Sequence, residues 1–346
     1  MNFRSDNVLG CPPQILEAMA RANAAPAHPY GNDPITARLN PRLSEIFEHE
    51  TFAFPVSSGT AANGLSLATV TPPWGAIFCH SLAHIAREEW CASEFFTGGA
   101  RLISVGGDVA GPAGAAKMLP ALLVKQIGES FNAAKPSTVS ITQTTEAGTV
   151  HSLDEIGALV DVARRHSLNA HMDGARFTNA LVALGCSPAD MSWRIGVDAL
   201  ALGATKNGTL TAEAVVVFRK DFAEELAHRR KRAGQVSSKM RFLSAQLEAY
   251  FTDDLWLNNA RAANRAGKRL ADGLTAAGVE LAAAVDANLV FPKLAAPKVA
   301  ALRAAGFEFL DWPWLGDDVV RLVCGFSTSD ESVDRLIRAV KQGPGT

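Results

Sequence analysis

The sequence predicts a large α/β domain with a doubly wound, mostly parallel sheet, followed by a smaller C-terminal α+β domain. Its 346 residues exceed a single typical domain of roughly 100 to 200 residues. Short apolar runs alternate with amphipathic stretches between residues 50 and 220, and longer helical stretches follow; such alternation is typical of βα units. We therefore expect an N-terminal arm over residues 1–12, a large ligand-binding domain over 13–235 and a small domain over 236–346.

Apolar runs rich in β-branched residues predict the strands of the large sheet. They cover residues 51–56, 76–79, 101–105, 138–142, 168–172, 199–202 and 214–218. Between the fourth and fifth run, Ser152 and Glu155 have the spacing of a capping box, which predicts that a helix begins there.

The region after residue 220 predicts the smaller domain. A second capping box, formed by Thr328 and Glu331, predicts the start of the last helix, and residues 343–345 predict a tail. The other expected elements are a helix over residues 255–278, a strand over 289–294, a helix near 297–305 and a strand over 319–324.

The composition is that of a globular protein, with 48% hydrophobic and 20% charged residues. The 33 basic and 35 acidic side chains give no broad basic field, and the longest basic run covers only residues 229–232. A nucleic acid is therefore not an expected partner. No window approaches the roughly 18 apolar residues of a membrane span, and no apolar segment follows Arg4. We expect neither a membrane partner nor a secretory signal.

The five cysteines indicate a reducing compartment. They are odd in number, far apart and never in a CxxC pair, so they suggest neither a disulfide framework nor a zinc site. We expect a cytoplasmic protein without a bound metal ion.

Polar residues directly after the apolar runs are the candidate functional residues, because ligands of doubly wound sheets bind beyond the carboxyl ends of the strands. The first run is followed by a small-residue turn over residues 57–63 that opens a helix. Backbone N–H groups and hydroxyls in such a turn suit a phosphate. Similar turns also cap helices that bind nothing, so the turn by itself leaves both interpretations open.

Two further loops carry charged groups. The run 168–172 leads into Asp173 and Arg176, and the run 199–202 leads into a glycine-flanked loop with Lys206. A carboxylate in this position can pair with the protonated pyridine nitrogen of a cofactor, and a partly desolvated lysine near other cations can form an imine. When each loop is taken alone, an ordinary ion pair and a solvated loop lysine are the alternatives.

The order of these features along the chain is more specific than any one of them. The phosphate turn is followed about one hundred residues later by the carboxylate, and some thirty residues after that by the lysine. With this order the chain resembles the threonine aldolase family of fold type I pyridoxal-5′-phosphate (PLP) enzymes, in particular its bacterial phenylserine and low-specificity threonine aldolases. The matching segments are residues 4–7, 29–33, 58–63, 71–84, 171–176, 203–208 and 229–245.

The resemblance implies the fold type I PLP-dependent transferase fold, with PLP held as a Schiff base on Lys206. It assigns Asp173 to the pyridine nitrogen, and His84 to stacking on the ring near the substrate hydroxyl. A structural histidine at a helix end is the alternative for His84. The residues that match the phosphate-holding group are Ser58, Gly59 and Thr60.

The resemblance also implies how the substrate carboxylate is bound. Arg176 and Arg321, with Ser5, match the carboxylate clamp, and a guanidinium suits a planar carboxylate. Arg176 is assigned to the cofactor site as well. Arg321 lies inside an apolar stretch where an unpaired charge is costly, so a buried structural ion pair is its alternative.

Other matching residues suggest that subunits share their active sites. Arg241 and Lys231 match a cation near the phosphate, and Tyr30 matches a residue that the neighbouring subunit supplies. Simple packing in a turn is the alternative for Tyr30. We expect a homodimer or homotetramer with shared active sites.

One position departs from the family. Many members carry a second active-site histidine on the loop before the strand predicted over residues 138–142, and this chain has Phe131 there. An apolar ring in the pocket predicts that substrates with an aryl or bulky β-substituent, such as phenylserine, are cleaved better than threonine.

The predicted reaction is the retro-aldol cleavage of an L-β-hydroxy-α-amino acid to glycine and an aldehyde, with Lys206 and His84 as catalytic residues. This makes the protein an aldehyde-lyase. The same fold hosts β-eliminating lyases, aminotransferases and racemases, and these activities, an altered substrate or a lost activity are the alternatives. A non-enzymatic amino-acid sensor would need an additional domain and is not expected.

Overall fold

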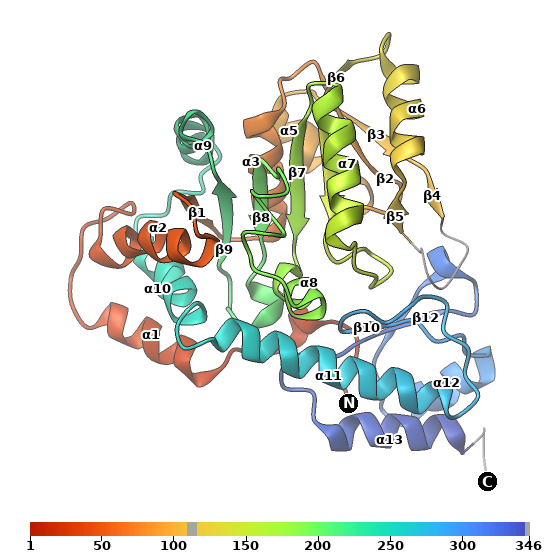
Figure 1. Ribbon diagram of the computed structural model, residues 1–346. Coiled ribbons are helices and arrows are strands. Elements are labelled where there is room, and N and C mark those ends of the chain that lie inside the picture. The colour runs from red at the N-terminus through yellow and green to blue at the C-terminus, as the bar shows by residue number, and fades with distance from the viewer. Residues whose placement is uncertain (109–115, 343–346) are drawn as a thin grey trace.

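The computed structural model describes residues 1–108 and 116–342, so the tail predicted at residues 343–345 lies outside the described residues. Within these ranges, the large domain is built on a seven-stranded sheet with the order β1-β9-β8-β7-β6-β2-β3 (Figure 1). Among its described strands, β9 alone runs against the common direction. The predicted doubly wound, mostly parallel sheet is therefore confirmed. Its strands are β1 (Phe52–Val56), β2 (Gly75–His80), β3 (Arg101–Val105), β6 (Lys135–Thr142), β7 (Asn169–Gly174), β8 (Ala199–Leu202) and β9 (Glu213–Val217).

Helices cover both faces of this sheet because successive residues of a strand point to opposite sides. In β8, Leu200 and Leu202 pack into the core with α2, α7 and α8, whereas Ala199 and Ala201 pack with α3 and α9. Figure 1 shows α7 and α8 in front of the sheet and α3 and α5 behind it. The helices are α2 (Pro34–Phe47), α3 (Gly59–Val70), α5 (Ala92–Thr97), α6 (Pro120–Ser130), α7 (Leu153–Arg165), α8 (Phe177–Leu184) and α9 (Lys220–Arg232).

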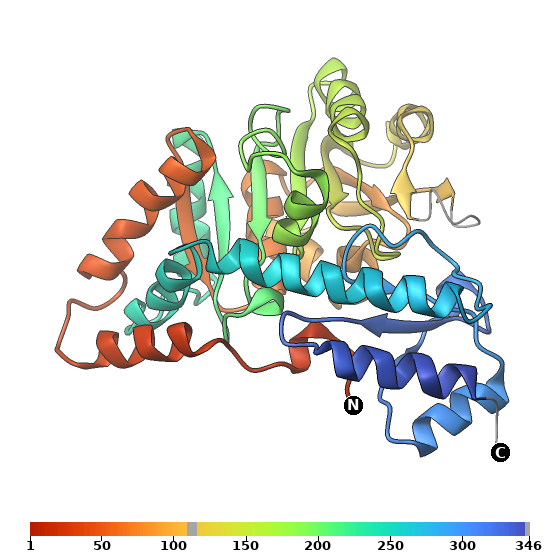
Figure 2. The same ribbon diagram turned by 60° about the horizontal axis from the view of Figure 1, so that its bottom comes forward.

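The smaller C-terminal part is an α+β unit, as predicted. Its sheet has the order β10-β12-β11, and the long helix α11 runs beneath the large domain into it (Figure 2). A separate two-stranded ribbon, β4 (Gly107–Asp108) with β5 (Lys117–Met118), flanks the large sheet. The small-domain elements are α11 (Leu255–Thr275), β10 (Leu289–Val290), α12 (Ala296–Ala304), β11 (Leu310–Asp311), β12 (Val320–Val323) and α13 (Asp330–Lys341).

The N-terminal arm is part of the small domain's core. The Phe3 backbone N–H donates to the Glu308 carbonyl at 2.8 Å, and the Val323 N–H donates to the Phe3 carbonyl at 2.8 Å. The Phe3 ring is 1% exposed and packs in the same apolar cluster as Leu322. These contacts fix the residues that follow Phe3 at the junction of the two domains.

Core packing favours a domain boundary later than residue 235. Helix α10 (Arg241–Tyr250) contributes Leu247 and Tyr250 to the large core, and Trp256 at the start of α11 joins the same cluster. Helix α10 also packs against α1 (Pro13–Asn23). The boundary at residues 235 and 236 stays a prediction, and the shared core places α10 with the large domain.

The two predicted helix starts differ in outcome. At α7 the capping box is present: Ser152 Oγ accepts from the Glu155 N–H at 3.1 Å, and Glu155 accepts from the Ser152 N–H at 2.7 Å. At α13 the predicted box is wrong by one residue. Ser329 is the cap, accepting from the Ser332 N–H at 3.2 Å, because Thr328 accepts from the Gly325 N–H in the preceding turn instead.

The described helices include none that is both long and apolar enough to cross a membrane.

Buried histidines make the fold sensitive to acid. Burial lowers the pKa of His80, His151 and His171 from 6.5 to about 4 each. The unfolded chain therefore binds more protons than the folded chain between these values, so stability is complete above about pH 6.5 and falls as the pH drops toward 4. Each histidine is expected to remove about 1.4 kcal/mol per pH unit in this window.

Chemical denaturation at pH 7.0, 6.0 and 5.5 measures this loss. His171→Asn is expected to reduce the slope, because His171 is 0% exposed, whereas the exposed His228→Asn is the matched control. A free energy of unfolding that stays constant from pH 7.0 to 5.5 would contradict neutral burial of these rings.

Candidate active site

The candidate site is a cavity at the carboxyl ends of the parallel strands, where the rule for doubly wound sheets places it. Several predicted residues meet in its wall although they come from separate strand-end loops. They are Ser58, Gly59, Thr60, His84, Asp173, Arg176 and Lys206.

Lys206 lies in a single 3₁₀ turn, η2 (Thr205–Asn207), directly after β8. The turn is held by its neighbours: the Ala204 N–H donates to Glu213 at 2.5 Å, and the Asn207 side chain donates to the Tyr250 hydroxyl at 2.7 Å. A side chain at Gly203 would collide with the Ala175 backbone, since a Cβ there would lie 2.4 Å from the carbonyl oxygen. The lysine is thus presented by a turn whose position does not depend on its own side chain.

Asp173 ends β7 as a buried carboxylate that is 2% exposed. Its Oδ2 accepts from Asn63 Nδ2 at 3.0 Å, and its Oδ1 accepts from the Ala175 N–H at 3.1 Å. These bonds fix the plane of the carboxylate in the cavity wall.

His84 is connected to Asp173 through two buried residues that the sequence did not single out. His84 begins the short helix α4 (His84–Arg87), and its Nδ1 lies 2.8 Å from Glu89 Oε1. Asn63 Nδ2 donates to the same oxygen at 2.9 Å. Burial opposes the charged ring, but the hydrogen bond to Glu89, aided by Glu146 and Asp173, raises the pKa of His84. His84 is therefore more readily protonated than an ordinary histidine.

One edge of the Arg176 guanidinium is hydrogen-bonded to another side chain of the protein. Its Nε and Nη2 donate to the two oxygens of Asp6 at 2.7 and 2.8 Å, and both side chains are buried. Burial opposes the charge on Asp6, but Arg176 lowers the pKa of that carboxyl below its usual value. Asp6 thus occupies the Nε/Nη2 edge of Arg176, and the Nη1/Nη2 edge remains for the predicted role in clamping a substrate carboxylate.

Arg321, on β12, has spare donor capacity. Within the described chain its buried Nε has no partner, and its Nη2 makes only a long, 3.3 Å bond to the Arg4 carbonyl. The guanidinium lies 4.3 Å from the Trp312 ring. It stands outside the cavity wall but faces the charges of Arg176 and Glu146, and burial, reinforced by Arg176, lowers its pKa to about 10. The alternative of a buried structural ion pair is wrong, because no carboxylate of the described chain pairs with Arg321.

Ser5 is not in the cavity wall either. Its Oγ accepts from the Asn7 N–H at 3.1 Å and caps the turn η1 (Asp6–Val8), whose Asn7 does line the cavity.

Three predicted site residues, Tyr30, Lys231 and Arg241, lie outside the wall of their own chain's cavity. Tyr30 is 51% exposed and lies under Lys231, with Nζ 4.6 Å from the ring. Its backbone N–H donates to the Ser238 carbonyl, near Arg241, whose Nε donates to the Ala22 carbonyl at 3.0 Å. None of the described cavity-wall residues belongs to this group.

Phe131 is also outside the cavity, contrary to the substrate-binding role expected for it. It is the residue that ends α6, and its side chain is 76% exposed. The turn after α6 directs the ring outward, so the aryl preference that was inferred from Phe131 has no support in this chain's own pocket.

Besides Glu89, two carboxylates in the cavity wall were not predicted from the sequence, Glu146 and Glu213. Glu146 follows β6, and Glu213 begins β9. Glu146 comes after a predicted strand, as Asp173 and Lys206 do, so the same sequence signal marks it, whereas Glu213 precedes its strand and gives no such signal. Burial raises the pKa of both carboxyls.

Comparison with known proteins agrees with this geometry. The family model described as beta-eliminating lyase matches residues 2–297. A low specificity L-threonine aldolase of Pseudomonas aeruginosa is 40% identical over 98% of this chain and 96% of its own length. The chain belongs to the threonine aldolases of the beta-eliminating lyase family. A second threonine aldolase of this kind, from a Pseudomonas species, is 37% identical over 98% of this chain and 97% of its own length.

Solved structures place this threonine aldolase family member among fold type I enzymes. The threonine aldolase of Leishmania major superposes with a TM-score of 0.91 at 26% identity, covering 99% of both chains. An aspartate aminotransferase of Thermus thermophilus, at 16% identity, shares the fold with a TM-score of 0.70 over 99% of this chain and 95% of its own. PLP is the cofactor of this family, which confirms the predicted cofactor.

The residues around the cavity fit PLP. The N–H groups of Gly59 and Thr60 open α3, where they have no acceptor within the helix, and a Cβ at Gly59 would meet nothing within 4 Å. This leaves room for a phosphate at a helix N-terminus. A lysine amine and a buried, oriented carboxylate stand in the same wall, as the imine bond and the pyridine nitrogen require.

Proposed function

We propose that this protein is a PLP-dependent aldolase that cleaves threonine- or phenylserine-like L-β-hydroxy-α-amino acids to glycine and an aldehyde. The observation that carries the proposal is the meeting of Lys206, Asp173 and the N-terminus of α3 in one cavity, in a chain 40% identical to a curated threonine aldolase. We assign PLP attachment to Lys206, the pyridine nitrogen to Asp173 and the phosphate to residues 58–60. Bound PLP supplies an electron-withdrawing ring that stabilises negative charge at the substrate Cα.

The chain's own residues then bind and orient the substrate. We assign the α-carboxylate to Arg321, whose Nε is unpaired within the described chain, with Ser5 and the free Nη1 of Arg176 as further donors. A guanidinium with spare donors suits a planar carboxylate. Because Glu89 fixes Nδ1 of His84, its Nε2 is the atom that remains to contact the cofactor ring and the substrate hydroxyl.

We also propose that two or four copies assemble with shared active sites. Tyr30, Lys231 and Arg241 lie outside the wall of their own chain's cavity, with Lys231 over the Tyr30 ring, which suits residues that complete the cavity of a neighbour. The exposed rings of Trp90 and Phe95, at 98% and 80%, offer apolar surface for such contacts. The cytoplasm remains the proposed compartment, supported by five free thiols at cysteines that all lie in the described ranges.

Substrate assays test the reaction. We expect glycine and aldehyde in equal amounts from threonine, allo-threonine or phenylserine, without pyruvate, ammonia or a need for a keto acid. The family model is described by β-elimination, which makes β-elimination the second candidate, and it releases pyruvate and ammonia from serine. Pyruvate formation without glycine release would decide for that candidate, and a keto-acid requirement would indicate aminotransfer.

A further inference from the structure

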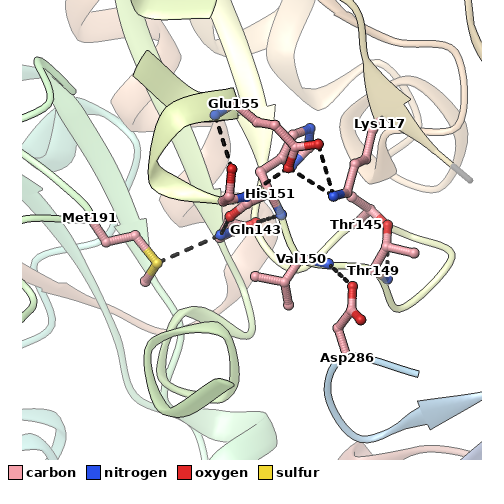
Figure 3. Close-up of polar contacts among 10 residues, drawn as sticks. Lys117, Gln143, Thr145, Thr149, Val150, His151, Glu155, Met191 and Asp286 are labelled. Carbon is pink, nitrogen blue, oxygen red and sulfur yellow. Dashed lines mark hydrogen bonds and ion pairs between the residues drawn. The ribbon is translucent and has the colours of Figure 1, made fainter. Parts of the chain in front are cut away.

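The loop between β6 and α7 is closed at its base by a buried glutamine. Gln143, which is 0% exposed, donates from Nε2 to the His151 carbonyl at 2.9 Å and accepts from the His151 N–H at 3.0 Å. Figure 3 shows these paired bonds across the loop ends, with Lys117 and Glu155 beside them. The Gln143 side chain thus makes the pair of hydrogen bonds that two backbone strands would form in a β-hairpin.

The tip of the same loop is fixed both internally and against the small domain. The Thr145 N–H donates to the Thr149 carbonyl at 2.9 Å. The Val150 N–H donates to Asp286 at 2.9 Å (Figure 3). Gly148 has φ +77°, and a Cβ there would lie 3.0 Å from Leu289 Cβ. Side chains carried by this loop therefore project from a rigid support.

Glu146, between these two anchoring points, enters the cavity wall with Lys206 and His84. Within the described chain, no group donates a hydrogen bond to its carboxylate. The other carboxylates of the site are each held by the protein: Asp6 by Arg176, Asp173 by Asn63, Glu89 by His84, and Glu213 by Ala204. Glu146 is thus the described carboxylate of this site whose lone pairs are left for a ligand.

The surroundings of Glu146 favour proton acceptance over a purely structural role. Burial raises its pKa, against the opposing charges of His84, Lys206 and Arg176, and a carboxylate with a raised pKa is a stronger base than an exposed one. His84 is less suited to that task, because its Nδ1 is bound by Glu89 and its raised pKa keeps a larger share of the ring in the protonated form, which cannot accept a proton.

We propose that Glu146 is the general base that accepts the β-hydroxyl proton of the substrate, an inference that rests on the proposed aldolase function. An Oε of Glu146 takes the proton while the O–H electron pair forms the C=O bond of the departing aldehyde. The Cα–Cβ bond breaks, and its electron pair stays on Cα, stabilised by the electron-withdrawing cofactor, until a proton returns there. Nothing is oxidised or reduced, and the products are glycine and the aldehyde.

The test compares Glu146→Gln and Glu146→Asp with the control Glu88→Gln, which changes an exposed glutamate in the neighbouring α4 segment. Two reactions of the PLP-loaded proteins are measured: glycine release from phenylserine or threonine, and exchange of the glycine α-proton in D₂O by NMR, which involves no β-hydroxyl. General base catalysis contributes about 10²- to 10⁴-fold. We expect Glu146→Gln to slow cleavage by that factor and to change proton exchange by less than about threefold, whereas Glu88→Gln changes neither.

A readout without turnover accompanies the kinetics. Infrared titration of the cofactor-free protein should show a carboxyl that protonates above the ordinary glutamate pKa of 4.5 and that is missing in Glu146→Gln. In the wild type, the acidic limb of kcat for cleavage should follow this group, with His84, Asp173, Lys206, Arg176 and Arg321 as the other charged residues that face it.

Three outcomes would overturn the assignment. Unchanged cleavage by Glu146→Gln excludes Glu146 as the base, and an equal loss of cleavage and proton exchange shows a role in holding the site together. If the wild type exchanges the glycine proton but releases no glycine from any β-hydroxy amino acid, the aldolase function itself fails and the base assignment fails with it.

Discussion

Lys206→Ala is expected to abolish both turnover and covalent attachment of PLP while leaving the fold intact. The turn that carries Lys206 is held by Glu213, Asn207 and Tyr250 rather than by the lysine side chain. Of the described lysines, Lys206 alone lines the cavity, so no other amine stands ready to form the imine.

Borohydride reduction, digestion and mass spectrometry locate the attachment, since reduction turns an imine into a stable amine. The wild type should carry the label on Lys206. Lys220→Ala, which removes an exposed lysine, should keep the label and the activity. A label on any other lysine, or a coloured and active Lys206→Ala protein, would refute the assignment of the site.

Arg321→Ala is expected to weaken substrate binding by roughly 2 to 5 kcal/mol, or about 30-fold to several thousandfold, as when one partner of a desolvated charge pair is lost. The reason is that Arg321 has spare donors, whereas the equivalent edge of Arg176 is occupied by Asp6. The absorbance of the bound cofactor should not change, because Arg321 stands outside the cavity wall.

A matched control exists in the same domain. Arg303 also lies over an aromatic ring, 5.1 Å from Phe309, but its charge pairs with Asp311 at the surface. Arg303→Ala should therefore leave the apparent affinity unchanged. Arg321→Lys keeps the positive charge but lacks the planar pair of guanidinium donors, so it should bind substrate more tightly than Arg321→Ala but more weakly than the wild type. Equal affinities of Arg321→Ala and the wild type would show that Arg321 only supports the packing of Trp312.

The inner strands of the sheet could be predicted from the sequence because they are buried on both faces. Such strands form continuous apolar runs, and the predicted range 199–202 coincides with β8. The predicted range 101–105 also coincides with β3, although this edge strand is partly exposed. Boundaries that depend on a hydrogen bond rather than on hydrophobicity were less accurate. The cap of α13 lies one residue later than predicted because Thr328 accepts a hydrogen bond from the Gly325 N–H, a contact that residue spacing does not reveal.

Site residues that directly follow strands could be predicted from the sequence. Site residues that depend on hydrogen bonds to partners far away in the sequence could not. Asp173 and Lys206 lie at strand ends, so the position of the runs located them. Asn63 reaches Asp173 across 110 positions of sequence, and Asp6 reaches Arg176 across 170. Neither link has a local pattern: the first follows from the packing of α3 on the sheet, and the second from the position of the N-terminal arm against the large domain.

The residues whose roles were expected from the family resemblance alone have positions in this chain that do not explain those roles. Phe131 is exposed at the end of α6, and Tyr30 and Arg241 lie outside the cavity wall of their own chain. A single chain cannot report which surfaces of a neighbour complete its cavity, so these positions depend on how copies assemble.

The docking of Phe3 between Glu308 and Val323 bears on when the enzyme becomes competent during its synthesis. The large sheet is built from residues 52–217, which leave the ribosome well before the strand that receives Phe3. Until β12 has been made, Phe3 has no partner at Val323. The arm that carries Asp6 is therefore not yet fixed in the position where Asp6 binds Arg176. The large domain is therefore expected to fold first. The active site is expected to be completed among the last folding steps, when the N-terminal arm, which is synthesised first, binds a strand of the C-terminal domain, which is synthesised last.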